Sequence, residues 1–303
     1  MHTSDSARGL RFLVLIAVVA TIGALPSMPG WAVRAQVPAV KFDVRAARGL
    51  PVAPFYEGWY EVDGTRYALF GYSNRNLQEV VDIPIGPNNH LAPGPPDQGQ
   101  PTRFFPGINY GVFAAALPKN QPKTELTWTL TANGQTLSIP TALDSQYVIT
   151  PQHENGGAYP DNTPPILKFD PAGPSAQGPH GIVVTRTATV SRPLALDVWV
   201  TDDGLPPRPR REGPASRARR PVTSRPSPEG LALGWQVYRG SGAVSFSDPL
   251  PTVEQGQART TVTFSQAGDY MLHLQAVDSR TATRCCWTNA YVKVAVDGGA
   301  ERR

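Results

Sequence analysis

Cysteine is scarce in this 303-residue chain: there are only two, and they are adjacent, Cys285 and Cys286. A disulfide between neighbours closes no loop, so a covalent staple across the fold is excluded. In an oxidising compartment three states stay open, namely a vicinal disulfide, bridges between molecules, or two buried thiols. A redox-catalytic pair is disfavoured because such thiols normally have spacer residues between them. We therefore favour a rigid local turn.

Long amphipathic helical patterns are also lacking. The chain contains 32 prolines, and an interior proline removes a helical hydrogen bond and clashes with the preceding turn. Helical bundles and doubly wound α/β enzymes are therefore disfavoured. The hydrophobic fraction of 40% is nevertheless sufficient for a packed core.

Only one long apolar run is present, Phe12–Leu25, and it lies near the start of the chain. Arg8 and Arg11 precede it, and Val33–Ala35 offers the small residues that signal peptidase requires. This pattern predicts a secretory signal peptide at 1–35. A transmembrane anchor fits less well, because the run is shorter than the roughly 20 residues of a span. We expect a secreted or periplasmic protein with no membrane span after signal removal.

Two β-hairpins are indicated by their turn residues. Tyr56–Tyr72 contains Asp63-Gly64, and Leu126–Ile139 contains Asn133-Gly134; both dipeptides favour two-residue type I′ turns. The first register places Tyr60 opposite Tyr67 and Glu61 opposite Arg66. The second sets apolar residues against apolar ones and hydroxyls against hydroxyls, a pairing that stabilises a hairpin.

Further short strands follow at regular spacing, which predicts an all-β fold of two β-sandwich-like domains. The expected strands are Leu77–Ile83, Ile108–Leu117, Ile166–Phe169, Gly181–Val190, Leu194–Thr201, Leu231–Tyr238, Ala243–Phe246, Arg259–Phe264, Asp269–Val277 and Asn289–Val296. The predicted division is a β domain at 36–150, a linker at 151–164, a sandwich at 165–297 and a tail at 298–303. We expect a long loop at Pro84–Gly107 and a flexible basic insertion at 206–230, rich in proline and arginine.

The C-terminal half resembles Ig-like and PKD-like extracellular domains. Trp235 stands where such sandwiches have their core tryptophan, and Ala267–Asp278 is similar to their Gly-x-Tyr-x-hydrophobic-x-Leu strand. The resemblance implies that Tyr270 is the tyrosine-corner residue. The PKD signature Trp-Asp-Phe-Gly-Asp-Gly is missing, and Leu272 occupies the place of the second core cysteine of antibody domains. No inter-sheet disulfide is therefore implied.

The N-terminal half resembles uncharacterised exported bacterial proteins. The resemblance rests on Glu57–Tyr60 together with Asp82–Asn89. It implies no activity.

The first candidate site is one face of the first hairpin. The register assigns to it Trp59, Phe70, Glu57, Glu61 and Arg66. An exposed tryptophan among carboxylates could stack on a sugar or contact a partner protein, although ordinary edge covering or an interdomain contact is the alternative. The opposite face, with Tyr60, Tyr67 and Leu69, is expected in the core.

The second and third candidates are charged clusters. The basic insertion could hold an anionic polymer, or could be a solvated loop; its candidate contacts are Arg208, Arg210, Arg211, Arg217, Arg219 and Arg220. Stacking aromatics are absent from 206–230, so no sequence-specific nucleic-acid partner is expected. Asp197, Asp202 and Asp203, with Asp248 and Asp278 elsewhere, could ligate calcium, although aspartate is also common in turns. No other cofactor is expected.

Catalytic motifs are lacking: there is no Gly-x-Ser-x-Gly, no His-Glu-x-x-His and no phosphate-binding loop. The least implausible catalytic group is His90 with Asp82 and Arg103. His273 alternates away from the Tyr270 face, so we expect it to be exposed. The leading interpretation is a non-enzymatic binding or structural module with an envelope protein or polysaccharide as partner. The alternatives are a carbohydrate-active or other hydrolase near His90, and an adhesion module joined by intermolecular cysteine bridges.

Overall fold

The computed structural model describes residues 46–117, 125–151, 161–204, 231–278 and 286–298, and the backbone alone at 225–226. The predicted signal peptide at 1–35 and the six candidate arginines between 208 and 220 lie outside these residues. In the part that is described, no helix is long and apolar enough to cross a membrane. Apart from one short 3-10 helix, η1 (Ser145–Tyr147), the regular elements there are strands, so the all-β prediction is confirmed.

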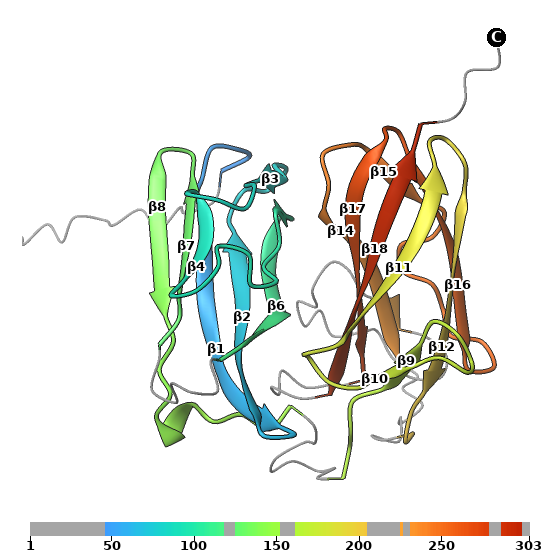
Figure 1. Cartoon of the computed structure of the whole chain (residues 1–303), viewed down its shortest axis with the longest axis horizontal. Coiled ribbons are helices and arrows are strands. Elements are labelled where there is room, and N and C mark those ends of the chain that lie inside the picture. Colours follow the sequence, from blue (N-terminus) through green and yellow to red (C-terminus); the bar gives the residue numbers. More distant parts are fainter. Residues whose placement is uncertain are drawn as a thin grey trace, which may run out of the picture. The chain divides into compact units, whose positions relative to one another are not determined.

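The described residues of the N-terminal half form eight strands, most of which are labelled in Figure 1. They are β1 (Val52–Val62), β2 (Thr65–Asn74), β3 (Val81–Asp82), β4 (Asn89–Ala92), β5 (Arg103–Phe104), β6 (Gly107–Ala116), β7 (Thr127–Ala132) and β8 (Gln135–Pro140). They form the sheets β1-β2-β6 and β4-β7-β8 and the pair β3-β5. Phe70, Phe113 and Trp128 pack ring against ring, with centroids 5.0–5.8 Å apart. These rings form the centre of this half.

Both predicted hairpins are confirmed in their turns and registers. Asp63 and Gly64 have φ of 49° and 69°, and Asn133 and Gly134 have φ of 50° and 75°, as a type I′ turn requires. Tyr60 pairs with Tyr67 in the first hairpin. In the second, the hydroxyls of Thr131 and Thr136 lie 2.9 Å apart. The turn residues therefore determine the pairing of these strands.

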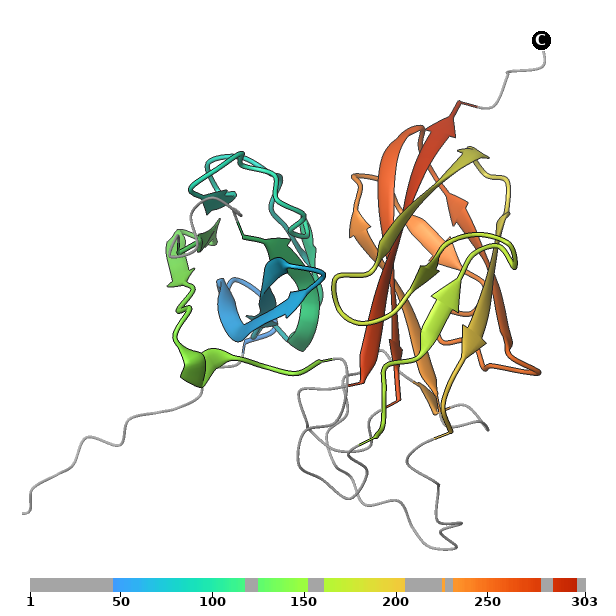
Figure 2. The same cartoon turned by 60° about the horizontal axis from the view of Figure 1, so that its bottom comes forward.

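The C-terminal half is an Ig-like sandwich of two five-stranded sheets (Figures 1 and 2). One sheet contains β10 (Ser175–Ala176), β9 (Ile166–Lys168), β12 (Leu194–Thr201), β16 (Gln257–Phe264) and β15 (Val244–Phe246) in that order. The other contains β11 (Ile182–Thr189), β18 (Trp287–Asp297), β17 (Gly268–Val277), β14 (Ala232–Arg239) and β13 (Arg225–Pro226). The chain passes repeatedly from one sheet to the other, in most cases after two consecutive strands in the same sheet.

Two residues carry the Ig-like character of this half. Trp235 is 3% exposed inside the core, as the resemblance implied. The Tyr270 hydroxyl donates a hydrogen bond of 3.0 Å to the backbone oxygen of Gln266, four residues upstream. This is the bond that defines a tyrosine corner.

The segment expected to be a long loop, Pro84–Gly107, is more ordered than the sequence suggested. It contains β4 and β5, and the fully buried Asn89 holds it together. The Asn89 amide donates to the backbone oxygens of Ile83 at 2.9 Å and Pro101 at 2.7 Å, and its oxygen accepts from the Trp128 indole at 3.1 Å. Prolines lack the backbone N–H that strand pairing requires. The Asn89 side-chain amide supplies hydrogen bonds that hold this segment in place instead.

Candidate functional site

The first hairpin does not present the aromatic face that the register suggested. Phe70 is completely buried among the core rings, and Glu57 is only 7% exposed. The Glu57 carboxylate accepts a 2.6 Å hydrogen bond from the backbone N–H of Gly111. A β-bulge between Tyr56 and Gly58 shifts the register at this point. Both faces of β2 are covered, so the prediction of an exposed Phe70–Glu57 face is wrong.

Trp59 is half-buried, and a guanidinium lies over one face of its ring. The Arg66 guanidinium carbon lies 5.0 Å from the centre of the indole, and the Glu61 carboxylate accepts a 3.0 Å bond from Arg66. The Trp59 indole N–H donates to the backbone oxygen of Asp144 at 3.1 Å. These contacts stabilise the hairpin and use the indole surface that a ligand would need.

The residues considered for catalysis fall into two sheets. Asp82 and Arg103 face each other on β3 and β5, 3.6 Å apart. Burial raises the pKa of Asp82, and the positive charge of Arg103 opposes that change. His90 lies on β4 and pairs with Thr129 of β7. The hydrolase hypothesis gains no support from this placement.

Three aspartates approach one another in the C-terminal half. Carboxylate oxygens of Asp202, Asp203 and Asp278 lie within 4.8 Å of one another. The Asp203 carboxylate also accepts hydrogen bonds from the backbone N–H and the hydroxyl of Thr163, at 2.8 and 2.7 Å. Asp197 is not in this group and pairs with Arg259 at 3.5 Å. A calcium site at Asp202 and Asp203 therefore stays a prediction, in which Asp278 replaces Asp197.

Cys286 is fully buried directly before β18 and takes part in a disulfide. Its φ is 76°, in the left-handed region. Cys285 lies outside the described residues, so the vicinal pairing stays a prediction.

The most elaborate polar arrangement joins the two halves, and we call it the junction. It consists of the outward side chains of β14, β17 and β18 and the backbone at 97–112. The Tyr291 hydroxyl donates to the backbone oxygen of Val112 at 2.9 Å, and the Tyr238 hydroxyl to that of Gly99 at 2.5 Å. The Asn289 amide donates to the backbone oxygen of Gly111 at 2.7 Å. Burial raises the pKa of both tyrosines, so their hydroxyls stay protonated donors.

An ion pair lies at the edge of the junction. Both terminal nitrogens of Arg239 donate to the Asp97 carboxylate at 2.8 Å, and the guanidinium Nε donates to the backbone oxygen of Gln100 at 3.0 Å. Hydrogen bonding to Arg239 lowers the pKa of Asp97, although burial opposes it. Two parallel bonds of this kind fix orientation as well as charge.

His273 is at the centre of the junction. It is 1% exposed, so the prediction that it meets solvent is wrong. Its Nε2 lies 3.0 Å from the Asn289 side-chain oxygen, and its Nδ1 lies 2.9 Å from the Gln236 amide nitrogen. Because the Asn289 amide nitrogen already donates to backbone carbonyls, its oxygen faces the ring, and Nε2 carries the hydrogen. Burial lowers the pKa of His273 to about 4, so the ring is neutral.

The junction also depends on the absence of a side chain at Gly111. A Cβ at Gly111 would lie 2.5 Å from the Trp287 ring, and Gly111 has a φ of +61°. Trp287 packs with Tyr60, Leu69 and Ile149 in a separate apolar cluster. This cluster covers the face of β2 opposite Phe70, which is why β2 has no solvent face.

Sequence reasoning allowed for an interdomain contact at the hairpin face but missed the side chains of β14, β17 and β18 that form the junction. The sequence did contain a signal that β2 is covered on both faces. Ala68–Tyr72 carries no charge at any position and does not alternate with polar residues. Such a run is typical of a strand that is covered on both faces.

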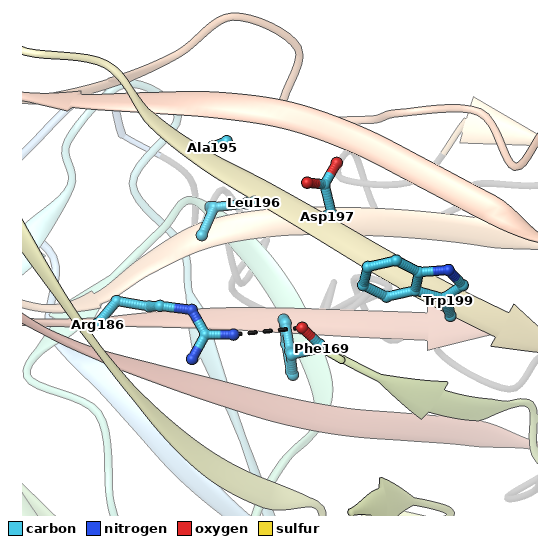
Figure 3. Close-up of a pocket in the computed structure, with 6 residues that line it drawn as sticks. All are labelled: Phe169, Arg186, Ala195, Leu196, Asp197 and Trp199. Atoms are coloured by element: carbon cyan, nitrogen blue, oxygen red, sulfur yellow. Dashed lines mark hydrogen bonds between the residues drawn. The ribbon is translucent and has the colours of Figure 1, made fainter. Parts of the chain in front are cut away.

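Two shallow depressions lie on the C-terminal sandwich. One, of about 110 Å³, is lined by Phe169, Arg186, Ala195, Leu196, Asp197 and Trp199 (Figure 3). The other, of about 320 Å³, lies over the outer face of β11, β14, β17 and β18, and its charged residues are Arg239, Asp269 and Lys293. Ligand pockets typically measure about 300–1,000 Å³, so the first could take only one substituent of a ligand.

Comparisons with known proteins give structural similarities of low degree. No protein-family model matches the chain, and no curated protein matches it. The D00-D0 domain of intimin is 10% identical over 80% of this chain and 99% of its own, with a TM-score of 0.23. Titin Ig tandem domains A164-A165 are 10% identical over 82% of this chain and all of their own, with a TM-score of 0.21.

Surface-layer protein SbsC is also similar. Its domains 4 and 5 are 10% identical over 57% of this chain and 65% of their own, with a TM-score of 0.22. The chain spans only 26–28% of three longer SbsC structures. TM-scores of this size support no argument about function.

Proposed function

We propose that this protein is a non-enzymatic structural or binding module that works in the periplasm or outside the cell. Two joined β-sandwiches would serve as a stiff support, and their loops and strand faces would contact an envelope protein or polysaccharide. Rigid sandwiches commonly carry their contacts in this way.

The observation that carries this proposal is the junction. Side chains of Tyr238, Asn289 and Tyr291 donate to backbone oxygens of the other half, from a surface that is nine-tenths buried or more. A buried donor that loses its acceptor costs about 1–3 kcal/mol, so each of these bonds opposes separation of the halves. Asp43–Arg303 accordingly forms one compact unit. Such stiffness suits a protein that transmits or supports contacts.

The structural part of the proposal is tested by unfolding. A chain of residues 36–303 should unfold in one cooperative transition, followed in parallel by tryptophan fluorescence and far-UV circular dichroism. Arg239→Ala combined with Asn289→Ala should lower stability and separate the two signals. Arg259→Ala, which removes an exposed pair outside the junction, is the matched control. Two transitions in the unchanged chain would contradict the proposal.

The binding part is tested with purified envelope. We expect the same chain to co-sediment with envelope fragments and to be released by excess unlabelled protein. A panel of glycosidase, esterase and peptidase substrates run beside it should give no turnover. Turnover that His90→Ala abolishes would instead establish the hydrolase, and absence of retention would contradict a binding role.

A further inference from the structure

Trp199 stands on the outer face of the sheet β10-β9-β12-β16-β15. Alternate residues of β12, among them Leu196, Val198 and Val200, are no more than 6% exposed inside the sandwich. Successive side chains of a strand point to opposite faces, so Asp197 and Trp199 point outward. Trp199 is half-buried, with part of its indole open to solvent. Among the residues that the structure describes, no guanidinium or ammonium lies over this indole, in contrast to the Arg66 guanidinium over Trp59.

Polar side chains surround this indole at fixed strand positions. Trp199 pairs with Lys168 on β9 and with Gln257 on β16, and Asp197 pairs with Arg259. The Arg259 Nε lies 3.5 Å from the Asp197 carboxylate, and the Arg259 guanidinium also donates to the Gln257 side-chain oxygen. Residues borne on strands hold their geometry better than residues on loops.

The notch of about 110 Å³ lies next to the indole (Figure 3). It exists because β9 pairs only with Trp199–Thr201, so the earlier part of β12 has no neighbour on that side among the described strands. Arg186 reaches into this gap from β11. Its guanidinium donates to the backbone oxygens of Thr185 at 2.9 Å and Phe169 at 3.3 Å, which fixes its position and leaves further N–H groups free to bind.

We propose that this surface, the Trp199 platform, binds a uronic-acid residue of an acidic polysaccharide. The apolar face of the sugar ring would stack on the indole, and the ring carboxylate would enter the notch and accept hydrogen bonds from Arg186. The sugar hydroxyls would bond to Asp197 and Gln257. This role rests on the proposed binding function and names its ligand class.

Charge and size favour this ligand over others. Lys168 pairs with Trp199, Arg186 lines the notch beside it, and Arg259 pairs with Asp197, so three positive groups accompany one aspartate at these positions. A guanidinium prefers carboxylate, which it can hold through two parallel bonds. The notch is too small for a whole ligand of about 300 Å³ or more but suits a single carboxylate. The half-buried indole next to it would contact one ring of a chain that continues in both directions.

The experiment uses oligogalacturonate and oligoalginate, with cello-oligosaccharide as the neutral comparison, titrated calorimetrically into the chain of residues 36–303. A single exposed site of this kind should bind with a Kd between about 0.1 and 10 mM. Trp199→Ala should weaken binding of the acidic oligomers at least about tenfold, the loss of roughly one stacked ring. Trp199→Tyr should retain most of it. Trp59→Ala is the matched control and should bind like the parent chain.

A second variant separates charge from stacking. Arg186→Gln should abolish the preference for acidic over neutral oligomers, and added salt should weaken binding by the parent chain. Circular dichroism should show that each variant is folded.

The proposed binding at the Trp199 platform is refuted if Trp199→Ala binds the acidic oligomers as well as the parent chain does. It is refuted equally if neither acidic oligomer gives heat of binding at about 10 mM. Stronger binding of the neutral oligomer overturns the uronic-acid assignment. Envelope retention that persists in Trp199→Ala while sugar binding is absent would leave the proposed function standing and remove only this site.

Discussion

His273 should make the protein sensitive to mild acid. In the folded chain the ring is neutral, because burial lowers its pKa from 6.5 to about 4. In the unfolded chain the ring regains its ordinary pKa of about 6.5. Between these two values the unfolded state binds the extra proton, so lowering the pH favours unfolding. The stabilisation is complete above about pH 6.5 and is lost progressively as the pH falls to about 4.

The magnitude follows from the two pKa values. A difference from 6.5 to about 4 corresponds to roughly 3 kcal/mol when the loss is complete. About 2 kcal/mol of this should be lost between pH 7 and pH 5, where most carboxylates remain ionised. That is a large part of the total for a protein whose whole stability is about 5–15 kcal/mol.

Urea unfolding at half-unit steps from pH 7.5 to pH 5 measures this loss. His273→Gln keeps a hydrogen-bonding side chain between Gln236 and Asn289 but does not titrate. It should lower stability at pH 7 and flatten the dependence on pH. His180→Gln is the comparison. Burial lowers the pKa of His180 as well, but this ring is only half-buried and stacks on Tyr67 outside the network, so its substitution should flatten the dependence on pH less than His273→Gln does. If His273→Gln and the parent chain lose stability in parallel, the neutral buried ring is refuted.

Three further changes test other parts of the fold by the same urea assay. Gly111→Ala would push a methyl group into Trp287 and should lower the free energy of unfolding by about 2–4 kcal/mol. Gly64→Ala, with open space around it, is the control and should lower it by only about 1–2 kcal/mol. Equal losses would contradict the close approach of Gly111 to Trp287. Tyr270→Phe removes the tyrosine-corner bond and should cost about 1 kcal/mol; no change would mean the bond contributes nothing. Asn89→Ala leaves two carbonyls and one indole N–H without their partner and should cost about 3 kcal/mol or more; a cost below about 1 kcal/mol would show that solvent replaces these bonds.

Local pairing was predictable because turn residues act over a few positions. Asp63-Gly64 and Asn133-Gly134 fix their registers through φ alone, and the structure reproduces both. The strand Leu194–Thr201 was likewise predicted with its bounds, since its apolar residues alternate without interruption. In the C-terminal half, Trp235 and Tyr270 were placed correctly by resemblance.

What each face contacts could not be predicted in the same way. A period of two separates the faces of a strand but does not tell which of them meets solvent. Phe70 and His273 were assigned to solvent because the opposite face already had a core, and both are buried by a second layer. The bulge at Glu57 adds one residue to β1, and nothing in the alternation of the strand marks it.

The hydrogen bonds of the junction are made mainly to the backbone of the N-terminal half. Tyr238, Asn289 and Tyr291 all end on carbonyl oxygens, of Gly99, Gly111 and Val112. Peptide carbonyls are present whatever the side chain, so these three acceptors depend on the path of the backbone. Side chains of this stretch also take part, because Asp97 pairs with Arg239, Phe105 packs against the core of the C-terminal half, and Gly111 has no room for a Cβ under the Trp287 ring. Variation that keeps the two halves joined is therefore limited to exposed positions such as Ile108.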